Sequence, residues 1–289
     1  ALKAMSISEN VEDPPGGYYG RDDDGRLNGL LAETAFNPVR ANILKLSAID
    51  GYRVMRRASR LYLSRGITFA QNGLADTTTI KALVPALRFG LIPLRLSVWP
   101  GAAAEEARKD GQWTLPEGER VHLGSVKLVS DGSLQGYTGF LNDPYFSVPE
   151  DHPPEYLGFP NQSPQQLSEQ VVQFHCAGRQ TAIHANGDAA ISMSLDAVAA
   201  ARQQCPDVTV QPVLIHAQMA TGEQLTRMQA LDVIPSFFNN HVYYWGDRHR
   251  DIFLGPERAS RISPLAEAAE QGLRFTLPAD SPGVPFQPL

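Results

Sequence analysis

The feature that most constrains this chain is a short apolar run that ends in a histidine and leads at once into a helix. The run is Thr181–His184, and residues 186–188, Asn-Gly-Asp, follow it as a turn and helix N-cap signal. Asp188 can accept hydrogen bonds from the free N–H groups of the next helix. His184 is therefore predicted at the carboxyl end of a strand, the edge where parallel α/β proteins bind ligands.

Two later segments repeat this construction. The apolar run Val213–Ile215 is followed by His216, and the run Leu273–Leu277 continues to Asp280. Because the carboxyl ends of parallel strands meet at one edge of a sheet, we expect His184, His216 and Asp280 to reach the same rim.

Strands and helices alternate from about residue 66 to the end of the chain. Strands are expected near residues 67, 92, 126, 182, 213, 234 and 275. Regular βα crossovers of this kind predict a parallel sheet, either open or closed into a barrel. The predicted class is α/β, a (β/α)8 barrel with about seven recognisable strands. Since a closed barrel has eight strands, we expect it to be incomplete.

The helices between these strands have their own signals. Thr221 and Gln224 form a capping-box pattern at the start of one of them. Residues 104–119 are expected to connect two strands, and residues 239–258 to form a long irregular loop. Other helices are predicted over about 77–89, 164–176, 189–203 and 264–271.

Residues 1–65 are the least regular part of the chain. Pro and Gly residues between positions 14 and 25 predict surface loops with room for one hairpin. A helix is predicted over residues 50–65, and we expect this whole excursion, 1–65, to pack on barrel strands two to eight in residues 66–289, within one structural domain. The apolar stripe of this helix is expected to be Val54, Ala58, Leu61 and Tyr62.

Composition narrows the class of partner. The 289 residues carry a net charge of −6 and no basic run, which argues against nucleic acid or an anionic membrane as the main partner and favours a small molecule. No apolar run reaches the ~18 residues that a membrane span needs. Cys176 and Cys205 lack metal-site spacing, so we expect both to be reduced, as in a cytoplasmic protein.

Two imidazoles and a carboxylate on one rim are a ligand set that suits Zn²⁺, and the carboxylate can also accept a proton from water. His184, His216 and Asp280 are therefore the candidate metal ligands, with Asp280 as the candidate catalytic base. Taken singly, each has a plain alternative. A histidine at such a place is often a hydrogen-bonded core residue, and Asp280 could cap a helix.

Further candidates come from neighbouring segments. Lys127 is a cation within the apolar strand 121–130, so it needs an ion-pair partner or a chemical role such as carboxylation to a metal-binding carbamate. Asp131 follows as a loop cap or a substrate contact. Aromatic residues and a histidine after the strand near 234 suggest a pocket, although they are equally typical of a core. The candidates for contacting substrate are Asp131, Trp99, His241 and Trp245, and most of the remaining histidines, His122, His152, His175 and His249, are expected at the surface.

The motifs VKLVSDGS, AIHANGD, LIHAQ and ADSPGVPFQPL, in this order, resemble the YtcJ-like branch of the amidohydrolase superfamily. The resemblance extends from about residue 14 onward, whereas no GxSxG, P-loop or GxGxxG motif indicates another enzyme class. It implies a distorted (β/α)8 barrel that hydrolyses amide or other C–N bonds of a small molecule with metal-activated water. The implied cofactor is one or two ions of Zn²⁺ or a similar divalent metal.

The resemblance also implies a role for each matching position. Lys127 corresponds to a lysine that is carboxylated and bridges two metal ions in some members. His184 and His216 correspond to metal ligands at strand ends, and Asp280 to a metal ligand that also acts as general base.

The sequence departs from the family at several points. It contains no His-x-His pair and no recognisable small β-sandwich, and Ile215 and Pro278-Ala279 stand where the family usually has Glu and Gly-Ser. We therefore expect a fragment, a processed chain or a diverged relative. The leading hypothesis is a metal-dependent hydrolase. The alternative is a catalytically inactive barrel that binds a small molecule or has a regulatory role. An incomplete barrel would expose strand edges, so a homodimer is expected.

Overall fold

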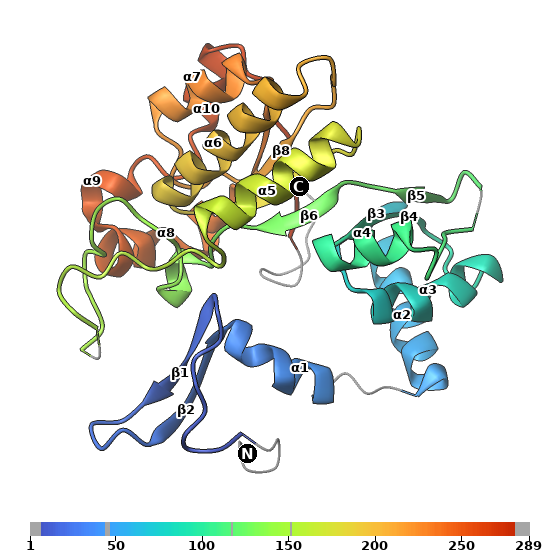
Figure 1. The fold of residues 1–289 in the computed structure, drawn as a ribbon, viewed down its shortest axis with the longest axis horizontal. Coiled ribbons are helices and arrows are strands. Elements are labelled where there is room, and N and C mark those ends of the chain that lie inside the picture. The colour runs from blue at the N-terminus through green and yellow to red at the C-terminus, as the bar shows by residue number, and fades with distance from the viewer. Residues whose placement is uncertain (1–6, 44–46, 117, 151, 281–289) are drawn as a thin grey trace.

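The computed structural model describes residues 7–43, 47–116, 118–150 and 152–280 (Figure 1). Its strands are β1 (Gly17–Arg21), β2 (Leu27–Glu33), β3 (Phe69–Ala75), β4 (Arg95–Pro100), β5 (Val121–Leu123), β6 (Val126–Val129), β7 (Thr181–Ala185), β8 (Val213–His216) and β9 (Ile234–Phe237). Its α-helices are α1 (Asn37–Ile43), α2 (Ala48–Ser64), α3 (Thr77–Arg88), α4 (Ala102–Lys109), α5 (Pro164–Cys176), α6 (Asp188–Gln204), α7 (Gly222–Ala230), α8 (Asn240–Arg248), α9 (Gly255–Ala259) and α10 (Leu265–Glu270). Shorter elements are the 3₁₀ helices η2 (Thr34–Phe36) and η3 (Leu134–Gly136) and the π-helical segment η4 (His249–Phe253).

The main sheet is parallel, as the sequence predicts. One part has the order β3–β4–β5 and the other β6–β7–β8–β9. A bridge between Gly101 and Lys127 joins the two parts, and a bridge between Ser236 and Thr276 adds the predicted last strand beside β9. Within the described residues nothing pairs β3 with the segment at Thr276, so closure into a barrel stays a prediction.

The predicted strand 121–130 is divided between two partners. Its first half, β5, pairs with β4, and its second half, β6, pairs with β7. The break lies at Gly124, whose N–H donates to the carbonyl of Val98. A side chain at Gly124 would collide with the indole of Trp99, so this close approach requires glycine.

Most helices between the strands begin and end within a few residues of the prediction. The capping box at Thr221 and Gln224 is present, and a second one stands at Ser163 and Gln166. Two expectations were wrong, because α4 lies in the supposed connection 104–119 and α8 to α9 lie in the supposed loop 239–258. In α4 the buried residues include only alanines as apolar side chains, which leave a weak helical pattern.

The expected packing face of α2 was wrong for Val54 and Leu61 and right for Tyr62. Val54 and Leu61 are 55% and 50% exposed, whereas Met55 and Tyr62 pack against the first core cluster of the sheet. The packed stripe is thus rotated by about one residue from the predicted one.

Strand β3 lies at the edge of its sheet. An open edge is a template for pairing with another chain, so the homodimer stays a prediction.

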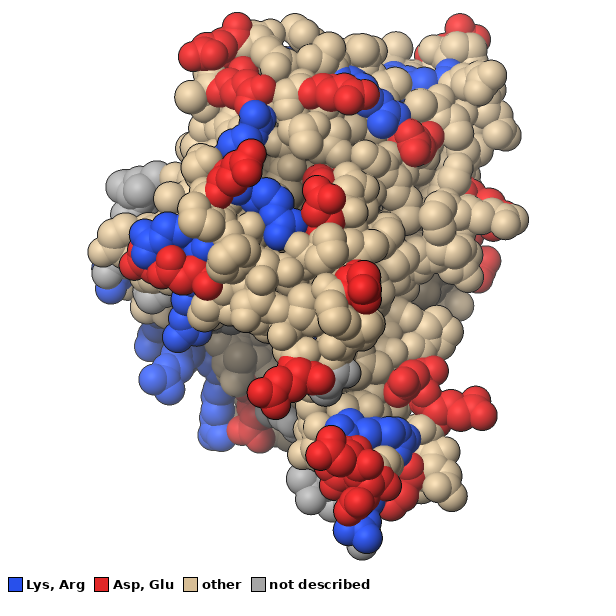
Figure 2. Space-filling view, turned by 90° about the vertical axis from the view of Figure 1, so that its left-hand side faces the viewer, with Lys and Arg blue, Asp and Glu red and all other residues tan. Residues whose placement is uncertain are grey.

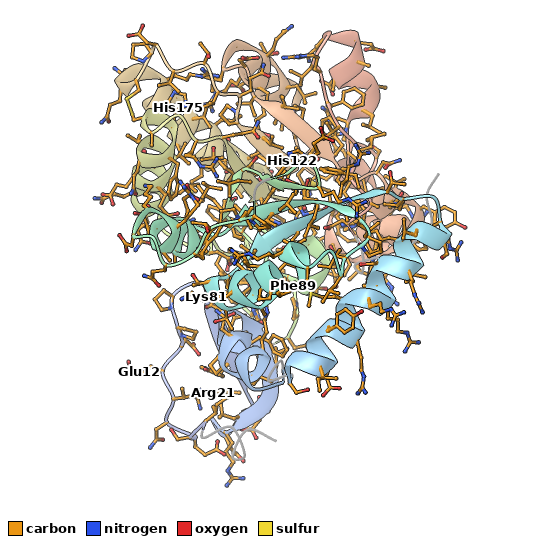
Figure 3. All side chains as sticks on the ribbon, turned by 90° about the vertical axis from the view of Figure 1, so that its right-hand side faces the viewer. Glu12, Arg21, Lys81, Phe89, His122 and His175 are labelled. Carbon is orange, nitrogen blue, oxygen red and sulfur yellow. A yellow bond between two sulfur atoms is a disulfide. The ribbon has the colours of Figure 1, made fainter. Side chains whose placement is uncertain are left out.

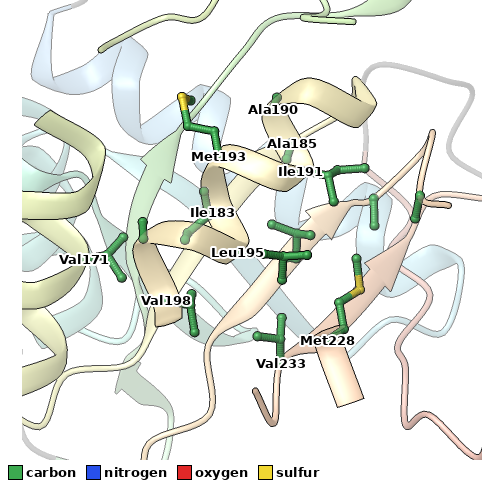
Figure 4. Packing of buried hydrophobic residues seen from close by; sticks show 14 of the residues in the cluster. Val171, Ile183, Ala185, Ala190, Ile191, Met193, Leu195, Val198, Met228 and Val233 are labelled. Atoms are coloured by element: carbon green, nitrogen blue, oxygen red, sulfur yellow. The ribbon is translucent and has the colours of Figure 1, made fainter. Parts of the chain in front are cut away.

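A second core cluster holds β7 and β8 in place. Ile183 and Leu214 are opposite each other in the parallel register and are both buried beneath α6. Figure 4 shows Ile183 packed beneath the α6 residues Leu195 and Val198. Burying each such side chain contributes roughly 1.5–3 kcal/mol, which fixes the strands that end at His184 and His216. Helices α5, α6, α7 and α10 follow one another along this side of the sheet (Figure 1).

A buried carboxylate ties α4 to the start of β7. Glu105 accepts hydrogen bonds from Arg108 and Arg179, and Arg179 also donates to the carbonyl of Gly124 at the β5–β6 break. Burial raises the pKa of Glu105, but these two arginines together hold it below its usual value. Glu105 is therefore a buried anion that positions the strand carrying Lys127.

The expectation of reduced cysteines was wrong. Cys176 is the last residue of α5 and Cys205 follows the end of α6, and the two form a disulfide with Cα atoms 5.5 Å apart. Because α5 and α6 lie side by side and end together, residues 29 positions apart meet. The argument from cysteine usage for a cytoplasmic location is therefore lost.

Replacing Cys176 by Ser is expected to lower the free energy of unfolding by roughly 3 kcal/mol, because the disulfide restricts the unfolded chain over a loop of this size. Urea unfolding of the oxidised protein and of Cys176→Ser would measure the difference. A reductant should bring the parent protein to the level of the variant and leave the variant unchanged. Two reactive thiols in unfolded, unreduced protein would contradict the disulfide.

The expectation that neither nucleic acid nor an anionic membrane is the main partner stays a prediction. Acidic and basic side chains are interspersed over most of the face in Figure 2. Of the helices in the described part of the chain, none combines the length and apolar character that crossing a bilayer requires.

Candidate active site

Strand alternation brings Lys127 and His184 to the same face of the sheet. Lys127 lies opposite Ala182 in the register, two residues before His184. Leu128, next to Lys127 on β6, and Ile183, next to His184 on β7, both belong to the core that the helices cover. Since side chains alternate between the two faces of a strand, Lys127 and His184 belong to the face away from the helices.

His216 reaches the same place by a different route. In the register it lies opposite Ala185, so a regular strand would turn its ring toward the helix-covered face. Its φ is instead 70°, a left-handed conformation that ends the strand. The rings of His184 and His216 then meet edge to face, with their centroids 4.7 Å apart. This backbone turn brings the two histidines together.

Asp280 completes the group. It follows the short pairing at Thr276, and one carboxylate oxygen, Oδ2, lies 3.8 Å from Nε2 of His216. Its side chain is 50% exposed, and its φ of 45° is again left-handed. Residues other than glycine in such conformations cost about 1–3 kcal/mol each, and such strain concentrates at functional sites.

Burial sets the charge states of the group. It lowers the pKa of Lys127 to about 7, although the charge of Asp280 opposes the shift. It lowers the pKa of His184 to about 3, with a further contribution from Lys127, and takes that of His216 well below its usual value. Burial also raises the pKa of Asp280, against the attraction of Lys127. Both imidazoles are thus neutral and keep a lone pair for a ligand.

The loop after β6 fixes the ring of His184. Nε2 of His184 lies 2.9 Å from the carbonyl oxygen of Gly132, which also accepts from the side-chain amide of Asn186 at 2.7 Å. The amide nitrogen of Asn186 also lies 3.1 Å from Nε2, but it donates to the Gly132 carbonyl at the shorter distance. Because that carbonyl can only accept, we assign the proton of His184 to Nε2. This tautomer leaves Nδ1 of His184 with the free lone pair.

Asp131 holds the loop after β6 through hydrogen bonds to backbone N–H groups. It is completely buried, and its carboxylate accepts backbone N–H bonds from Phe140, Asn186 and Gly187. Burial raises its pKa to about 7 in spite of these donors. The contacts are those of the predicted loop cap. A direct contact of Asp131 with substrate stays a prediction.

Two further histidines extend the group. His241, predicted to line a pocket, is buried with its ring 5.8 Å from that of His216, and His249 lies 6.1 Å beyond His241. The surface expectation for His249 was wrong, as it was for His175, which is buried where α5 meets Cys205. A π-helical segment, η4, begins at His249, and such segments are frequent at functional sites. The spacing of residues in the sequence gave no signal that His249 lies near the site.

Two other histidines lie elsewhere: Figure 3 shows His175 on α5 and His122 in the region of β5.

The two predicted tryptophans are not brought to the histidines. Trp99 donates to the hydroxyl of Ser97 and lies over Gly124. Trp245 is partly exposed and stacks with the guanidinium of Arg248 at 5.3 Å. Ring contacts between either tryptophan and the histidine group are absent from the described residues, so their contact with substrate stays a prediction.

The side-chain types of His184, His216 and Asp280 are those of zinc ligands, but the three do not converge on one point. Two neutral imidazoles and a carboxylate are zinc ligands, and Nδ1 of His216 is buried without a hydrogen-bond partner. In residues 7–43, 47–116, 118–150 and 152–280, however, no three side chains of His, Cys, Asp or Glu converge closely enough to hold a metal ion.

Comparison with known proteins supports this chemistry at the level of a family. The model of the amidohydrolase family matches residues 1–289. The putative amidohydrolase YtcJ of Bacillus subtilis (strain 168) is 26% identical over all of this chain and 54% of its own length. The N-substituted formamide deformylase of Arthrobacter pascens is 25% identical over all of this chain and 54% of its own length. The chain thus spans about half the length of these relatives.

A solved structure supports the fold. An uncharacterized metal-dependent hydrolase from Pyrococcus furiosus superposes with a TM-score of 0.75 over 98% of this chain and 56% of that chain, at 22% identity. At this identity the likeness shows the fold alone. The parallel α/β arrangement is therefore shared with a metal-dependent hydrolase.

Proposed function

Because the chain belongs to the amidohydrolase family, we propose that it forms part of the active site of a metal-dependent hydrolase that cleaves amide or other C–N bonds of a small molecule. The observation that carries the proposal is the proximity of His184, His216 and Asp280 at strand ends, with Lys127 on the same face of the sheet as His184 and within the electrostatic reach of Asp280. Two of the four, His216 and Asp280, have left-handed backbone conformations, which are frequent at functional sites.

Each side chain has a role that its environment supports. Neutral His184 and His216 would hold a divalent ion through their free lone pairs. Lys127, with a pKa of about 7, has a substantial fraction of uncharged amine near neutral pH, and this form adds carbon dioxide to give a carbamate and a proton. Asp280 would accept a proton from the attacking water. A bound divalent ion would polarise the substrate carbonyl and make that water a stronger nucleophile.

We propose that the sheet is part of a (β/α)8 barrel. The likeness in fold to the Pyrococcus furiosus hydrolase supports this proposal. If β5 and β6 are counted as one divided strand, β3 to β9 and the segment at Thr276 supply seven consecutive positions of a parallel sheet. Because the chain spans about half of its relatives, the activity and substrates of the whole protein are part of the same proposal.

The name of one relative suggests the substrates to try first. N-substituted formamides are small neutral amides, and neutral imidazoles are compatible with an uncharged substrate. The alternative function, small-molecule binding or regulation without catalysis, is favoured by the lack of three converging ligands in the described residues and of a His-x-His pair in the sequence.

Zinc removal separates the two functions. We expect protein purified without chelator to contain about one or more equivalents of zinc or a similar ion by elemental analysis. Chelation should lower hydrolysis of an N-alkylformamide or an N-acyl amino acid by at least about 100-fold, since the ion is worth several kcal/mol in the transition state, and added Zn²⁺ should restore it. Protein that holds no metal and hydrolyses no amide would instead favour the binding function.

A further inference from the structure

Glu33, the last residue of β2, has a backbone conformation that glutamate rarely adopts. Its φ is 48° and its ψ −116°. These angles are close to those of the first central residue of a type II′ turn, a position dominated by glycine. A side chain there costs about 1–3 kcal/mol. The strain therefore calls for a compensating role of the carboxylate.

The carboxylate of Glu33 holds a turn that lies 105 residues away in sequence. Its Oε1 accepts a hydrogen bond of 2.6 Å from the hydroxyl of Thr138. The same hydroxyl oxygen accepts from the backbone N–H of Ser133 at 2.9 Å, and the N–H of Gly132 donates to the carbonyl of Thr138 at 3.0 Å. Glu33 thus closes the turn from Gly132 to Thr138 from outside.

That turn supplies the hydrogen-bond partner of His184. The carbonyl of Gly132 accepts from Nε2 of His184, and the amide of Asn186 braces the same oxygen. A side chain at Gly132 would collide with the Thr138 hydroxyl and the Glu33 carboxylate. Gly132, the Thr138 hydroxyl and the Glu33 carboxylate are therefore in close contact next to His184.

The hairpin of β1 and β2 is seated on the same loop region by further contacts. The Tyr18 ring meets that of Phe159 at 6.0 Å, and Gly16 approaches the backbone of Asn161 too closely for a side chain. Figure 1 shows the hairpin below the sheet, with its upper end toward the loops that follow β6. The hairpin therefore contacts the loop region that contains residues 159–161.

We infer that Glu33 is a positioning residue for the candidate site, acting through Thr138 and the carbonyl of Gly132 to hold the tautomer and orientation of His184. The inference rests on the proposed function only in that His184 is taken as a metal ligand of the candidate site. The hairpin is then an integral part of the site, although its elements lie outside the parallel sheet.

The test uses metal-free protein and the Nε2 proton of His184, observed by NMR with ¹⁵N-labelled histidine and assigned by comparison with His184→Gln. In Glu33→Gly, which suits the backbone angles, this proton should exchange with solvent at least about tenfold faster than in the parent protein. Thr138→Val should give the same increase. Glu33→Gln and Thr138→Ser keep an acceptor and a hydroxyl, so both should retain the parent rate.

A matched control comes from the other end of the hairpin region. Glu9 accepts from the backbone N–H of Leu27, away from the turn, so Glu9→Gly should leave the His184 proton unchanged. Glu33→Gly should also keep or raise the melting temperature, because it removes strain. An unchanged exchange rate in both Glu33→Gly and Thr138→Val would overturn the inference.

A second test of the role of Glu33 measures the zinc affinity of the protein. Residues that orient a metal ligand typically contribute 10–100-fold to metal affinity, so Glu33→Gly should weaken zinc binding by about that factor. If the parent protein binds no zinc, the proposed function fails, while the exchange rates still decide the role of Glu33.

Discussion

Replacing Asp280 by Asn is expected to lower kcat for amide hydrolysis by about 10²–10⁴-fold, the range that a positioned proton acceptor contributes. Asn keeps the shape of the side chain and tolerates the left-handed φ of 45°, so the backbone should be preserved. What is lost is the negative charge 3.8 Å from His216 and the ability to take a proton. Initial rates on the amide that the parent protein hydrolyses best would measure the effect.

Asp232 offers a matched control for this change. It is another aspartate with a left-handed φ, 52°, and with a half-exposed side chain, but it lies after α7 and pairs with Gln211 and two arginines. Asp232→Asn should keep kcat within about threefold of the parent value. If Asp280→Asn did the same, Asp280 would not be the base, and the proposed mechanism would fail.

Replacing His216 by Ala is expected to weaken zinc binding by at least about 100-fold, more than the loss of a residue that only orients a ligand. His216 lies between His184 and Asp280, so its removal separates the other two donors. Its neutral ring, kept so by burial, is ready to bind without losing a proton. Competition with a zinc-binding dye would give the affinity, and elemental analysis the content as purified.

The control must match the burial of His216. His175 on α5 (Figure 3) is also a buried histidine, and its Nε2 lies 3.3 Å from the carbonyl oxygen of Cys205. His175→Ala should lose stability but keep its zinc. Equal zinc affinity in His216→Ala and the parent protein would show that the strand-end histidines do not bind the metal.

These two variants also separate the two functions proposed from the sequence. A working hydrolase predicts that Asp280→Asn loses turnover and that His216→Ala loses metal. A catalytically inactive barrel predicts that neither variant changes turnover, because there is none to lose. Binding of a small amide to the parent protein, unaffected by Asp280→Asn, would then favour the binding role.

Local signals were enough to predict much of the fold. Helices α3, α5 and α6 follow from apolar spacing and from turn and capping residues close to them in the sequence. The parallel class follows from the regular succession of strand and helix. Alternation along each strand is equally local, but it takes the register of β6 against β7 to place Lys127 and His184 on one face.

Other features depend on contacts between distant segments, which no local pattern encodes. The disulfide between Cys176 and Cys205 needs the side-by-side packing of α5 and α6. The burial of His249 needs α8 and η4 to fold back toward His216. The hold of Glu33 on Thr138 needs the hairpin to be seated on a loop far along the chain.

The sequence by itself determined the residue types: a lysine within one strand, and two histidines and an aspartate at strand ends, in an α/β chain of the amidohydrolase family. Only the tertiary structure decided how they face one another. Strand register alone would turn His216 away from His184, and the left-handed backbone at His216 reverses this. Such a conformation is unfavourable locally, so it persists only where the surrounding fold enforces it.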